Sequence, residues 1–326
     1  MRGGGQKRSG PKWDYVNQIV RDGALSMIAL QETHLTEERL EELQALYKRI
    51  KIFNSPDAEA PSRRGGVALV LNTSKVKWRG AECTTLQPGR AIQVRIEWGE
   101  DTYLTVAAVY APSGDDDKNR QFWEDLREQW SSGAIEKPDV VLGDLNMVEC
   151  ALDRMPAHTD NEGVITSFDL VMKACKLADG WRMANPDKVD YTFATKHTNS
   201  LNSRSRIDRI YVKEEWLDKC DEWHIEETGI RTDHKMVSVH LTTKDVPFVG
   251  RGRSTIPSLI TDYKAFRDFL LTKGRVLDEK LIALSENPER RTTGFNPQTV
   301  WKAFKTELKE AAKEFMRNRA TDLERE

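Results

Sequence analysis

The sequence predicts an α/β (α+β) protein in which antiparallel or mixed β-sheets pack face to face and helices cover them on the outside. Short apolar runs with alternating or β-branched residues recur between residues 26 and 241, which is typical of strands. Helical periods separate only some of these runs, so several strands follow one another directly. A parallel fold needs a crossover helix between its strands, and this order therefore favours antiparallel or mixed sheets. With 326 residues the chain can bury a large core.

The predicted elements follow from the period of the apolar residues, which is two in strands and 3.6 in helices. The expected strands are residues 26–30, 67–71, 91–96, 104–110, 140–142, 207–212 and 236–241. The expected helices are residues 13–20, 36–50, 118–130 and 166–177. Thr36 is the expected N-cap of the second helix, because a threonine hydroxyl accepts a hydrogen bond from an amide of the first turn.

The composition changes after residue 243, and we expect two parts, residues 1–243 and residues 244–326. Pro247, Gly250, Gly252 and Pro257 are typical of a linker. Two helical periods follow, and the second begins with Asn296-Pro297, an N-cap residue and a first-turn proline. The apolar face of this helix consists of Val300, Phe304, Leu308, Ala312 and Phe315. This C-terminal extension is basic and residues 1–243 are acidic, within a formal net charge of -2.

Charge and cysteine content exclude several classes of protein. A pI near 6.4 rules out a global basic field, so any contact with nucleic acid must come from local patches. The four cysteines lie far apart and form neither a metal-binding pair nor a disulfide framework. No apolar run is typical of a signal peptide or reaches the roughly 20 residues of a membrane helix. We therefore expect reduced thiols, no membrane partner and an intracellular protein of the nucleus and cytoplasm that is not secreted.

Carboxylates and an amide follow two of the predicted strands. Glu32 comes directly after the first strand, within Gln-Glu-Thr-His, and a solvated loop residue is the alternative interpretation. Asp144 and Asn146 follow the strand 140–142, and the glycine before them allows a close approach of the backbone. A spacing of two on an extended segment places both side chains on one face. A turn is the alternative here, because Asp and Asn favour turns.

Three further polar positions adjoin predicted strands. Tyr110 closes a strand within Tyr-Ala-Pro, where a core tyrosine before a proline is the alternative. Asp208 lies near the start of the strand 207–212 where an apolar residue is expected, and a buried carboxylate needs a partner. Asp233 and His234 precede the last strand and offer a metal-binding carboxylate and a proton-handling imidazole. An exposed loop histidine is the alternative.

Polar groups at the ends of successive strands are difficult to explain as independent turns. Such groups are Glu32, Asp144, Asn146, Asp208 and the Asp233-His234 pair. Carboxylates that gather in one place repel one another unless a cation lies between them. Oxygen ligands without a cysteine or histidine pair favour Mg²⁺, with Mn²⁺ as the alternative, over Zn²⁺. Because Mg²⁺ held by few carboxylates keeps open positions for phosphate oxygens and water, we expect phosphodiester hydrolysis.

Six motifs resemble, in order, those of the endonuclease/exonuclease/phosphatase superfamily over about residues 1–243. They are Gln31-Glu32-Thr33, Arg64-Gly65-Gly66-Val67-Ala68, Val109-Tyr110-Ala111-Pro112, Gly143-Asp144-Leu145-Asn146, Ser205-Arg206-Ile207-Asp208 and Thr232-Asp233-His234. Each motif is short, but six in this order are specific. Gln-Glu-Thr-His, Tyr-Ala-Pro and Tyr191-Thr192-Phe193 look most like the endonuclease of LINE-type (non-LTR) retrotransposons, more than apurinic repair endonucleases.

The resemblance implies a four-layered α/β sandwich with two packed mixed sheets flanked by helices, to which the C-terminal helical extension is appended. It also implies a Mg²⁺-dependent enzyme whose partner is DNA, which it nicks to leave a 3′-hydroxyl. In such an enzyme Glu32 would bind the metal and Asp233 would lie near it. Asp144 would position or deprotonate the attacking water.

The resemblance assigns roles to the remaining positions as well. Asn146 and Tyr110 would contact the scissile phosphate. His234, oriented by Asp208, would stabilise the charge of that phosphate. The candidates for contacts with DNA are Thr192, Arg204, Ser205 and Arg206.

One departure from the family pattern concerns the N-terminus. Family members open with a strand that ends in Asn-X-X-Gly, and Met1-Arg2-Gly3-Gly4 resembles the residues that directly follow this asparagine. We therefore expect a missing first strand, with lower stability and turnover. In a full element a reverse transcriptase follows the endonuclease, whereas this chain ends at Glu326.

Two alternatives remain open at this point. The superfamily also contains phosphatases of inositol lipids and phosphodiesterases of lipids. A catalytically degenerate remnant would instead bind nucleic acid through Arg204, Arg206, Arg209 and the basic extension, without cleaving it.

Overall fold

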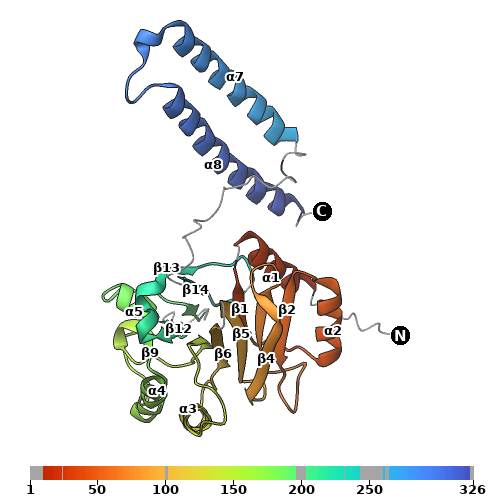
Figure 1. Cartoon of the computed structure of the whole chain (residues 1–326), viewed down its shortest axis with the longest axis vertical. Helices are drawn as coiled ribbons and strands as arrows, with labels where there is room; N and C mark the ends of the chain where they lie inside the picture. The colour runs from red at the N-terminus through yellow and green to blue at the C-terminus, as the bar shows by residue number, and fades with distance from the viewer. Residues whose placement is uncertain are drawn as a thin grey trace. The chain divides into compact units, whose positions relative to one another are not determined.

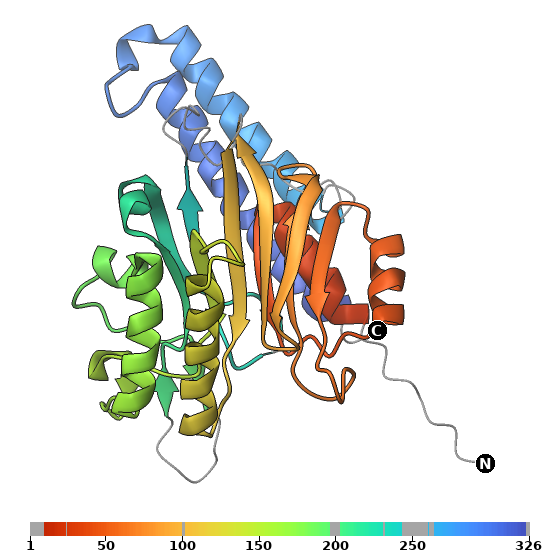
Figure 2. The ribbon, with the colours of Figure 1, turned by 60° about the horizontal axis from the view of Figure 1, so that its bottom comes forward.

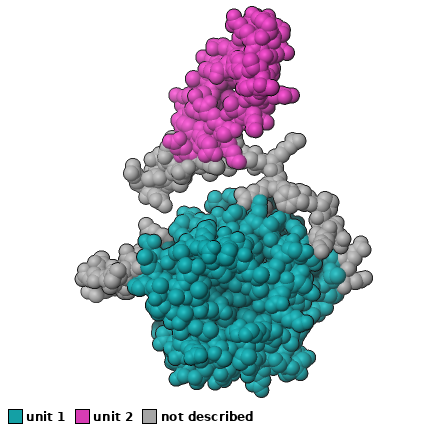
Figure 3. Space-filling model, turned by 90° about the vertical axis from the view of Figure 1, so that its left-hand side faces the viewer, with its two compact units in different colours: residues 1–246 teal, residues 247–326 magenta. Residues whose placement is uncertain are grey.

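The computed structural model of the chain describes residues 10–23, 25–99, 102–195, 203–230, 232–242, 260 and 264–323. The chain divides into two compact units, Met1–Val246 and Pro247–Glu326 (Figure 3). The boundary expected from the sequence lies near residue 244. Met1-Arg2-Gly3-Gly4 and the linker-like residues 247–257 lie outside the described residues.

The centre of the first unit is a six-stranded mixed sheet with the order β4-β5-β6-β7-β12-β9. Its strands are β4 (Lys77–Gln87), β5 (Ala91–Gly99), β6 (Thr102–Tyr110), β7 (Val140–Asp144), β9 (Leu177–Asp179) and β12 (Asp208–Lys213). β6 and β7 run parallel, and the other neighbouring strands are antiparallel. Every residue of β6 from Leu104 to Tyr110 is buried, as expected for a strand that is covered on both faces.

Two smaller antiparallel sheets pack against one face of this sheet. β1 (Met27–Gln31), β3 (Val67–Asn72) and β2 (Ile50–Ser55) form one, and β13 (Cys220–Glu226) and β14 (Met236–Leu241) form the other. β1 packs against β6 and β7, and β14 packs against β12, around a shared apolar core. The prediction of packed sheets is confirmed. Within the described residues, however, the second layer consists of two antiparallel sheets and not of one mixed sheet.

Helices cover both outer faces and complete four layers (Figures 1 and 2). α1 (Gly10–Asp22) and α2 (Glu37–Leu46) bury Trp13, Val20 and Leu43 against β2 and β3. α3 (Asp116–Ser131) and α4 (Glu162–Cys175) cover the other face of the six-stranded sheet and lie in front of the strands in Figure 2. Their largest buried side chains are Phe122, Trp123, Trp130 and Phe168.

Short elements connect the main ones. They are η1 (Ala151–Asp153), β8 (Arg154–Met155), α5 (Gly180–Ala184), β10 (Phe193–Ala194), β11 (Arg204–Ser205) and η2 (Glu214–Lys219). β10, β11 and β8 form a small antiparallel sheet with β11 in the middle. This sheet places residues 193 and 205 beside each other, close to the start of β12.

The predicted helix 36–50 is correct at its start and wrong at its end. The Thr36 hydroxyl accepts a hydrogen bond from the Arg39 amide, as predicted for an N-cap. The helix ends at Leu46, because Ile50 and Ile52 are buried in β2 and pair with β3. β4 and β13 were not predicted, since both strands expose most of their residues and lack a clear apolar alternation.

The second unit contains two helices, α7 (Lys264–Glu286) and α8 (Pro297–Leu323), with the turn η3 (Pro288–Arg290) between them. α8 begins as predicted, because the Asn296 side chain accepts hydrogen bonds from the amides of Gln298 and Thr299. Phe266 and Phe315 pack edge to face, with ring centroids 5.6 Å apart. No helix in the described ranges has both the length and the apolar character needed to cross a membrane.

Candidate active site

Three strands of the six-stranded sheet bring polar side chains to one edge. β6 and β7 run parallel, so their last residues, Tyr110 and Asp144, lie side by side. β12 runs antiparallel to β7, and its first residue, Asp208, pairs with Asp144. Asp144 is therefore the middle residue of three, and its side chain is only 5% exposed. The topology thus brings together residues that the sequence predicted at separate strand ends.

The backbone turns sharply around Asp144. Gly143 has φ 142°, and a Cβ atom there would lie 2.0 Å from the carbonyl oxygen of Val109. Only glycine fits such an approach, as the sequence predicted. The Asp144 carboxylate accepts a hydrogen bond from the Asn146 amide at 2.9 Å, and Asn146 has φ 49°. The expected extended segment is therefore wrong, because Asp144 and Asn146 form a turn that caps the end of β7.

Glu32 reaches the same edge from the outer sheet. It follows β1 with φ 50°, a conformation that a non-glycine residue adopts at a cost in energy. The amide of the next residue, Thr33, donates to the carbonyl oxygen of Gly66 and fixes this turn. The Tyr110 hydroxyl donates a hydrogen bond of 2.7 Å to Glu32 Oε1. This bond joins the two sheets at the site.

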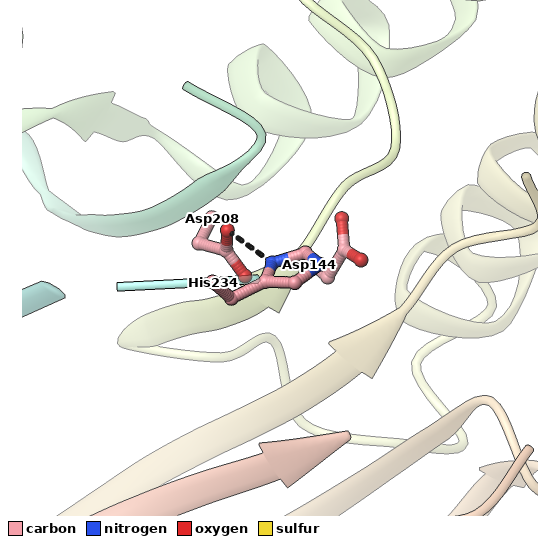
Figure 4. A group of neighbouring side chains, drawn as sticks. All are labelled: Asp144, Asp208 and His234. Carbon is pink, nitrogen blue, oxygen red and sulfur yellow. Dashed lines mark hydrogen bonds and ion pairs between the residues drawn. The ribbon is translucent and has the colours of Figure 1, made fainter. Parts of the chain in front are cut away.

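Asp208 and His234 form a second pair beside Asp144 (Figure 4). His234 Nδ1 lies 2.8 Å from Asp208 Oδ2, so the half-buried carboxylate has the partner that the sequence predicted it would need. The Asp208 amide donates to the Thr192 hydroxyl at 3.0 Å. The Phe193 ring packs against the His234 ring with centroids 4.8 Å apart. These contacts hold the imidazole between Asp208 and Asp144.

The charges of the site perturb one another strongly. Burial raises the pKa of the Asp144 carboxyl to about 7, and the negative charges of Asp208 and Glu32 add to this effect. Burial by itself would lower the pKa of His234, but its hydrogen bond with Asp208 and the surrounding carboxylates raise that pKa to about 9. Burial also raises the pKa of Tyr110, so its hydroxyl remains a hydrogen-bond donor at neutral pH. Negative charge therefore accumulates around Asp144 as pH rises.

A cation fits this arrangement on chemical grounds. Ligand atoms of Asp144, Asp208 and His234 all lie within 4.8 Å of one another. Burial, followed by the negative charge of Asp208, raises the pKa of Asp144 in spite of the Asn146 amide and the His234 imidazole, and a cation would stabilise the ionised carboxylate. Carboxylate oxygens predominate around it, which suits hard divalent ions better than Zn²⁺.

Other predicted residues occupy different environments. Asp233 is exposed, and its carbonyl oxygen accepts a hydrogen bond from the Ala194 amide. Arg204 is also exposed, whereas Ser205 beside it is buried. Thr192 is only 1% exposed and its hydroxyl is bonded to backbone groups. The predicted contact between the Thr192 side chain and DNA is therefore corrected, because this hydroxyl is enclosed and supports Asp208.

Arg206 requires a second correction. Its guanidinium is 2% exposed and binds Asp153 at 2.7 and 2.8 Å and Asp179 at 2.6 Å. Arg209 is equally buried and binds Glu149 at 2.8 Å. Neither guanidinium is accessible to a phosphate, so both arginines stabilise the fold. The sequence shows two basic residues beside Asp208 but not the distant carboxylates that enclose them.

One residue near the site was not predicted. The Arg90 guanidinium lies over the Tyr110 ring, 4.6 Å from its centroid. Arg90 comes immediately before β5 in a Gly-Arg turn. A charged residue directly ahead of a buried apolar strand was the signal that could have drawn attention to it.

Comparison with known protein families identifies the family to which this chain belongs. A family model described as Endonuclease/Exonuclease/phosphatase family matches residues 10–238. The chain belongs to this family. The match includes every site residue from Glu32 to His234. Membership of the endonuclease/exonuclease/phosphatase family identifies a hydrolase of the phosphodiesterase and nuclease type, and nucleases of this family use divalent metal ions.

Solved structures with this fold come from several kinds of enzyme. An AP endonuclease from Archaeoglobus fulgidus is 16% identical, with a TM-score of 0.58 over 71% of this chain and 94% of that chain. The endonuclease domain of TRAS1, a telomere-specific non-LTR retrotransposon, is 14% identical, with a TM-score of 0.52 over 73% and 95%. A Neisseria 3′ phosphatase, NExo, bound to a product DNA hairpin is 17% identical, with a TM-score of 0.55 over 72% and 95%. These likenesses establish the fold of the endonuclease/exonuclease/phosphatase family. No curated protein sequence matches the chain.

Proposed function

We propose that the chain is a Mg²⁺-dependent endonuclease that nicks DNA, of the type found in non-LTR retrotransposons. The observation that carries this proposal is the position of Asp144, buried between the Tyr110–Glu32 pair and the Asp208–His234 pair. The retrotransposon assignment draws support from the Gln-Glu-Thr-His and Tyr-Ala-Pro motifs and from the likeness to the TRAS1 endonuclease domain. The DNA substrate draws support from the AP endonuclease and the DNA-bound phosphatase among the similar structures.

Glu32 is the proposed metal ligand, and Asp233 is proposed to lie near the ion. His234 is proposed to bind the phosphate and not the metal, because its Nδ1 is already hydrogen-bonded to Asp208. Its bond with Asp208 also occupies one oxygen of that carboxylate. Bound Mg²⁺, or Mn²⁺ in its place, would neutralise charge on the scissile phosphate.

Asp144 is the proposed base for the attacking water. A pKa of about 7 is close to the optimum for a group that accepts a proton at neutral pH. The water oxygen forms a bond to phosphorus, its proton passes to Asp144, and the bond to the 3′ oxygen breaks. The leaving oxygen takes up a proton from solvent water, so the products are a 3′-hydroxyl and a 5′-phosphate.

The other residues of the site would bind the phosphate. Protonated His234, held at Nδ1 by Asp208, has its second ring nitrogen free to donate to a phosphate oxygen. Asn146 uses Nδ2 to donate to the Ala111 carbonyl oxygen, which leaves a second N–H on the same atom for the phosphate. Tyr110 donates to Glu32 in this state and would redirect its hydroxyl when the phosphate binds.

A nicking assay on supercoiled plasmid tests the proposal. With Mg²⁺ the chain should convert supercoiled plasmid to nicked circles, and a chelator should stop the reaction. DNA ligase should reseal the nicks, since it requires a 3′-hydroxyl and a 5′-phosphate. Intact plasmid together with phosphate release from a 3′-phosphorylated oligonucleotide would assign the site to phosphatase chemistry instead.

The non-catalytic alternative is weakened by the buried arginines. It relied on Arg204, Arg206, Arg209 and the basic extension to hold phosphates, and the guanidinium groups of Arg206 and Arg209 are enclosed by carboxylates. Mg²⁺-independent DNA binding without any nicking would restore that alternative.

A further inference from the structure

We propose that Arg90 is a positioning residue of this site, which holds the Tyr110 ring in place and through it the Tyr110–Glu32 pair. The inference rests on the proposed function for its kinetic consequences. It assigns to Arg90 an action through Tyr110 and not a contact with the substrate.

Arg90 contacts Tyr110 through both its side chain and its backbone. The guanidinium carbon lies 4.6 Å from the ring centroid, which is the range of an attractive cation–π contact. Nη1 of Arg90 also lies 3.5 Å from the Tyr110 carbonyl oxygen. In addition, the Tyr110 amide donates a hydrogen bond of 2.7 Å to the Arg90 carbonyl oxygen. The ring and the main chain of Tyr110 are therefore both restrained by one residue.

The surroundings of Arg90 differ from those of other partly buried basic residues. Arg95, Arg154 and Arg182 each form an ion pair with a carboxylate. Within the described part of the chain, no carboxylate oxygen lies within 4.0 Å of the Arg90 guanidinium. The aromatic face of Tyr110 is thus the principal partner of this cation. A positive charge over the ring also makes the phenolic hydroxyl a stronger hydrogen-bond donor.

The turn that carries Arg90 is bonded to the loop that carries Glu32. Gly89 has φ 69°, and a Cβ atom there would lie 2.7 Å from the Cα atom of Asp57, so the close approach requires glycine. The Gly89 carbonyl oxygen accepts from the Gly66 amide at 3.0 Å. Gly66 in turn accepts from the amide of Thr33, the residue after Glu32. Both members of the Tyr110–Glu32 pair are therefore tied to one turn.

This arrangement predicts which kinetic constant changes when Arg90 is replaced. Without the guanidinium the Tyr110 ring loses the cation that restrains its face, so the hydroxyl leaves its position beside Glu32 more often. A misplaced Tyr110 hydroxyl acts mainly on the transition state, so kcat should fall by a larger factor than KM changes. If Arg90 contacted a phosphate directly, its replacement would instead mainly raise KM and reduce the salt dependence of DNA binding.

A double-mutant cycle with Arg90→Met and Tyr110→Phe tests the proposal in the plasmid assay. Arg90→Met should lower kcat by about 10- to 100-fold when Tyr110 is present. It should cause less than about a threefold further loss in the Tyr110→Phe background, since the two residues act as one unit. Arg90→Lys should retain most of the activity because it keeps the cation. Equal losses in both backgrounds would overturn the proposal, and so would a rise in KM without a fall in kcat.

Arg95→Met is the matched control. Arg95 lies on β5 over the Tyr103 ring, 3.4 Å from its centroid, and this pair belongs to the opposite end of β5 and β6. Its removal should leave kcat unchanged. Unfolding midpoints of all variants provide a readout that does not depend on activity. The shift caused by Arg90→Met should be smaller in a Tyr110→Leu background, which removes the aromatic face, and an equal shift in the wild-type and Tyr110→Leu backgrounds would overturn the contact.

Failure of the proposed function is distinguishable from failure of this inference. A wild-type chain that leaves plasmid intact would refute DNA nicking alone. The same cycle would then be measured with a 3′-phosphorylated oligonucleotide, for which the expected coupling between Arg90 and Tyr110 is the same. An active wild type without coupling would refute the role of Arg90 alone.

Discussion

Asp144 and Asp153 are both buried carboxylates near β7 and β12, yet their pKa values move in opposite directions. Asp153 is 2% exposed and Asp144 is 5% exposed, so both are removed from water to a similar degree. Burial would raise the pKa of Asp153, but the hydrogen bonds and charges of Arg206, Arg209 and Arg182 lower it. Burial raises the pKa of Asp144 as well, and its neighbours Asp208 and Glu32 raise it further.

The comparison shows that the partners of a buried charge decide its role. Asp153 has guanidinium groups on several sides and remains ionised at any ordinary pH, so the loss of one of these partners would destabilise the fold. Asp144 has two carboxylates and one imidazole around it, so its charge depends on pH and on any added cation. A buried carboxylate whose negative charge is not neutralised by neighbouring cations, such as Asp144, indicates a functional site in this protein.

The largest effect should come from neutralising Asp144, whose negative charge is surrounded by further carboxylates. Asp144→Asn should lower nicking by about 10³-fold, since a general base of this kind contributes about 10²- to 10⁴-fold. The melting temperature should stay the same or rise, because the variant removes repulsion with Asp208 and Glu32. Asp153→Asn is the matched control and should instead lower the melting temperature. Near-normal nicking by the Asp144 variant would remove this residue from the site.

The next largest effect should come from removing Arg206 from the ion-pair cluster that it forms with Asp153 and Asp179. Arg206→Met leaves Asp153 and Asp179 without their main partner and should lower the free energy of unfolding by about 3 to 5 kcal/mol. Urea denaturation measures this loss. Nicking per folded molecule should change little below the transition. A stable variant with weakened DNA binding would reverse the correction and make Arg206 a DNA contact.

A change in pH should have a smaller effect, because it alters the charge of the active site but not that of the Asp153 ion pairs. His234 has a pKa of about 9 in the folded state, above its ordinary value of 6.5. The folded protein therefore keeps a proton that the unfolded chain loses in this interval, and the free energy of unfolding should fall as pH rises from 6.5 to about 9. The slope for one proton is at most about 1.4 kcal/mol per pH unit.

Denaturation of the metal-free protein at several pH values measures this slope. His234→Gln should flatten it above pH 7. Below that value Asp144 contributes a decline of the same sign, because its folded-state pKa of about 7 exceeds the ordinary 3.8. An unchanged slope in the His234 variant would assign the proton to another group.

The smallest effect should come from the exposed arginine. Arg204 lies on β11 close to the buried residue Arg206, but its own side chain is exposed. Arg204→Ala should weaken DNA binding a few-fold and reduce the slope of log Kd against log salt concentration by about 1. Fluorescence anisotropy with labelled DNA measures both values. Identical slopes for the variant and the wild type would exclude a phosphate contact.

Much of the fold followed from local patterns in the sequence. The buried strands were predicted because their apolar residues run without interruption, as in β3 and β6. The ends of these strands then located Tyr110, Asp144 and Asp208. Strands with mostly exposed residues, β4 and β13, carried no such pattern, so their existence depends on pairing with distant neighbours.

The environment of individual side chains was less predictable. Arg206 and Thr192 look like surface residues in the sequence, and their burial results from contacts with residues far along the chain. The turn at Asn146 was predicted only as the alternative to an extended segment, because its left-handed backbone depends on the Asp144 carboxylate and on Ala111. Such long-range contacts leave no periodic signal.

The bond between Tyr110 and Glu32 also bears on when the protein becomes competent to react. Glu32 comes from the outer layer and Tyr110 from the central sheet, and His234 follows much later along the chain. A chain emerging from the ribosome can therefore assemble the site only after residue 234 has left the exit tunnel and the layers have docked. A nascent or partly unfolded molecule should be chemically inert.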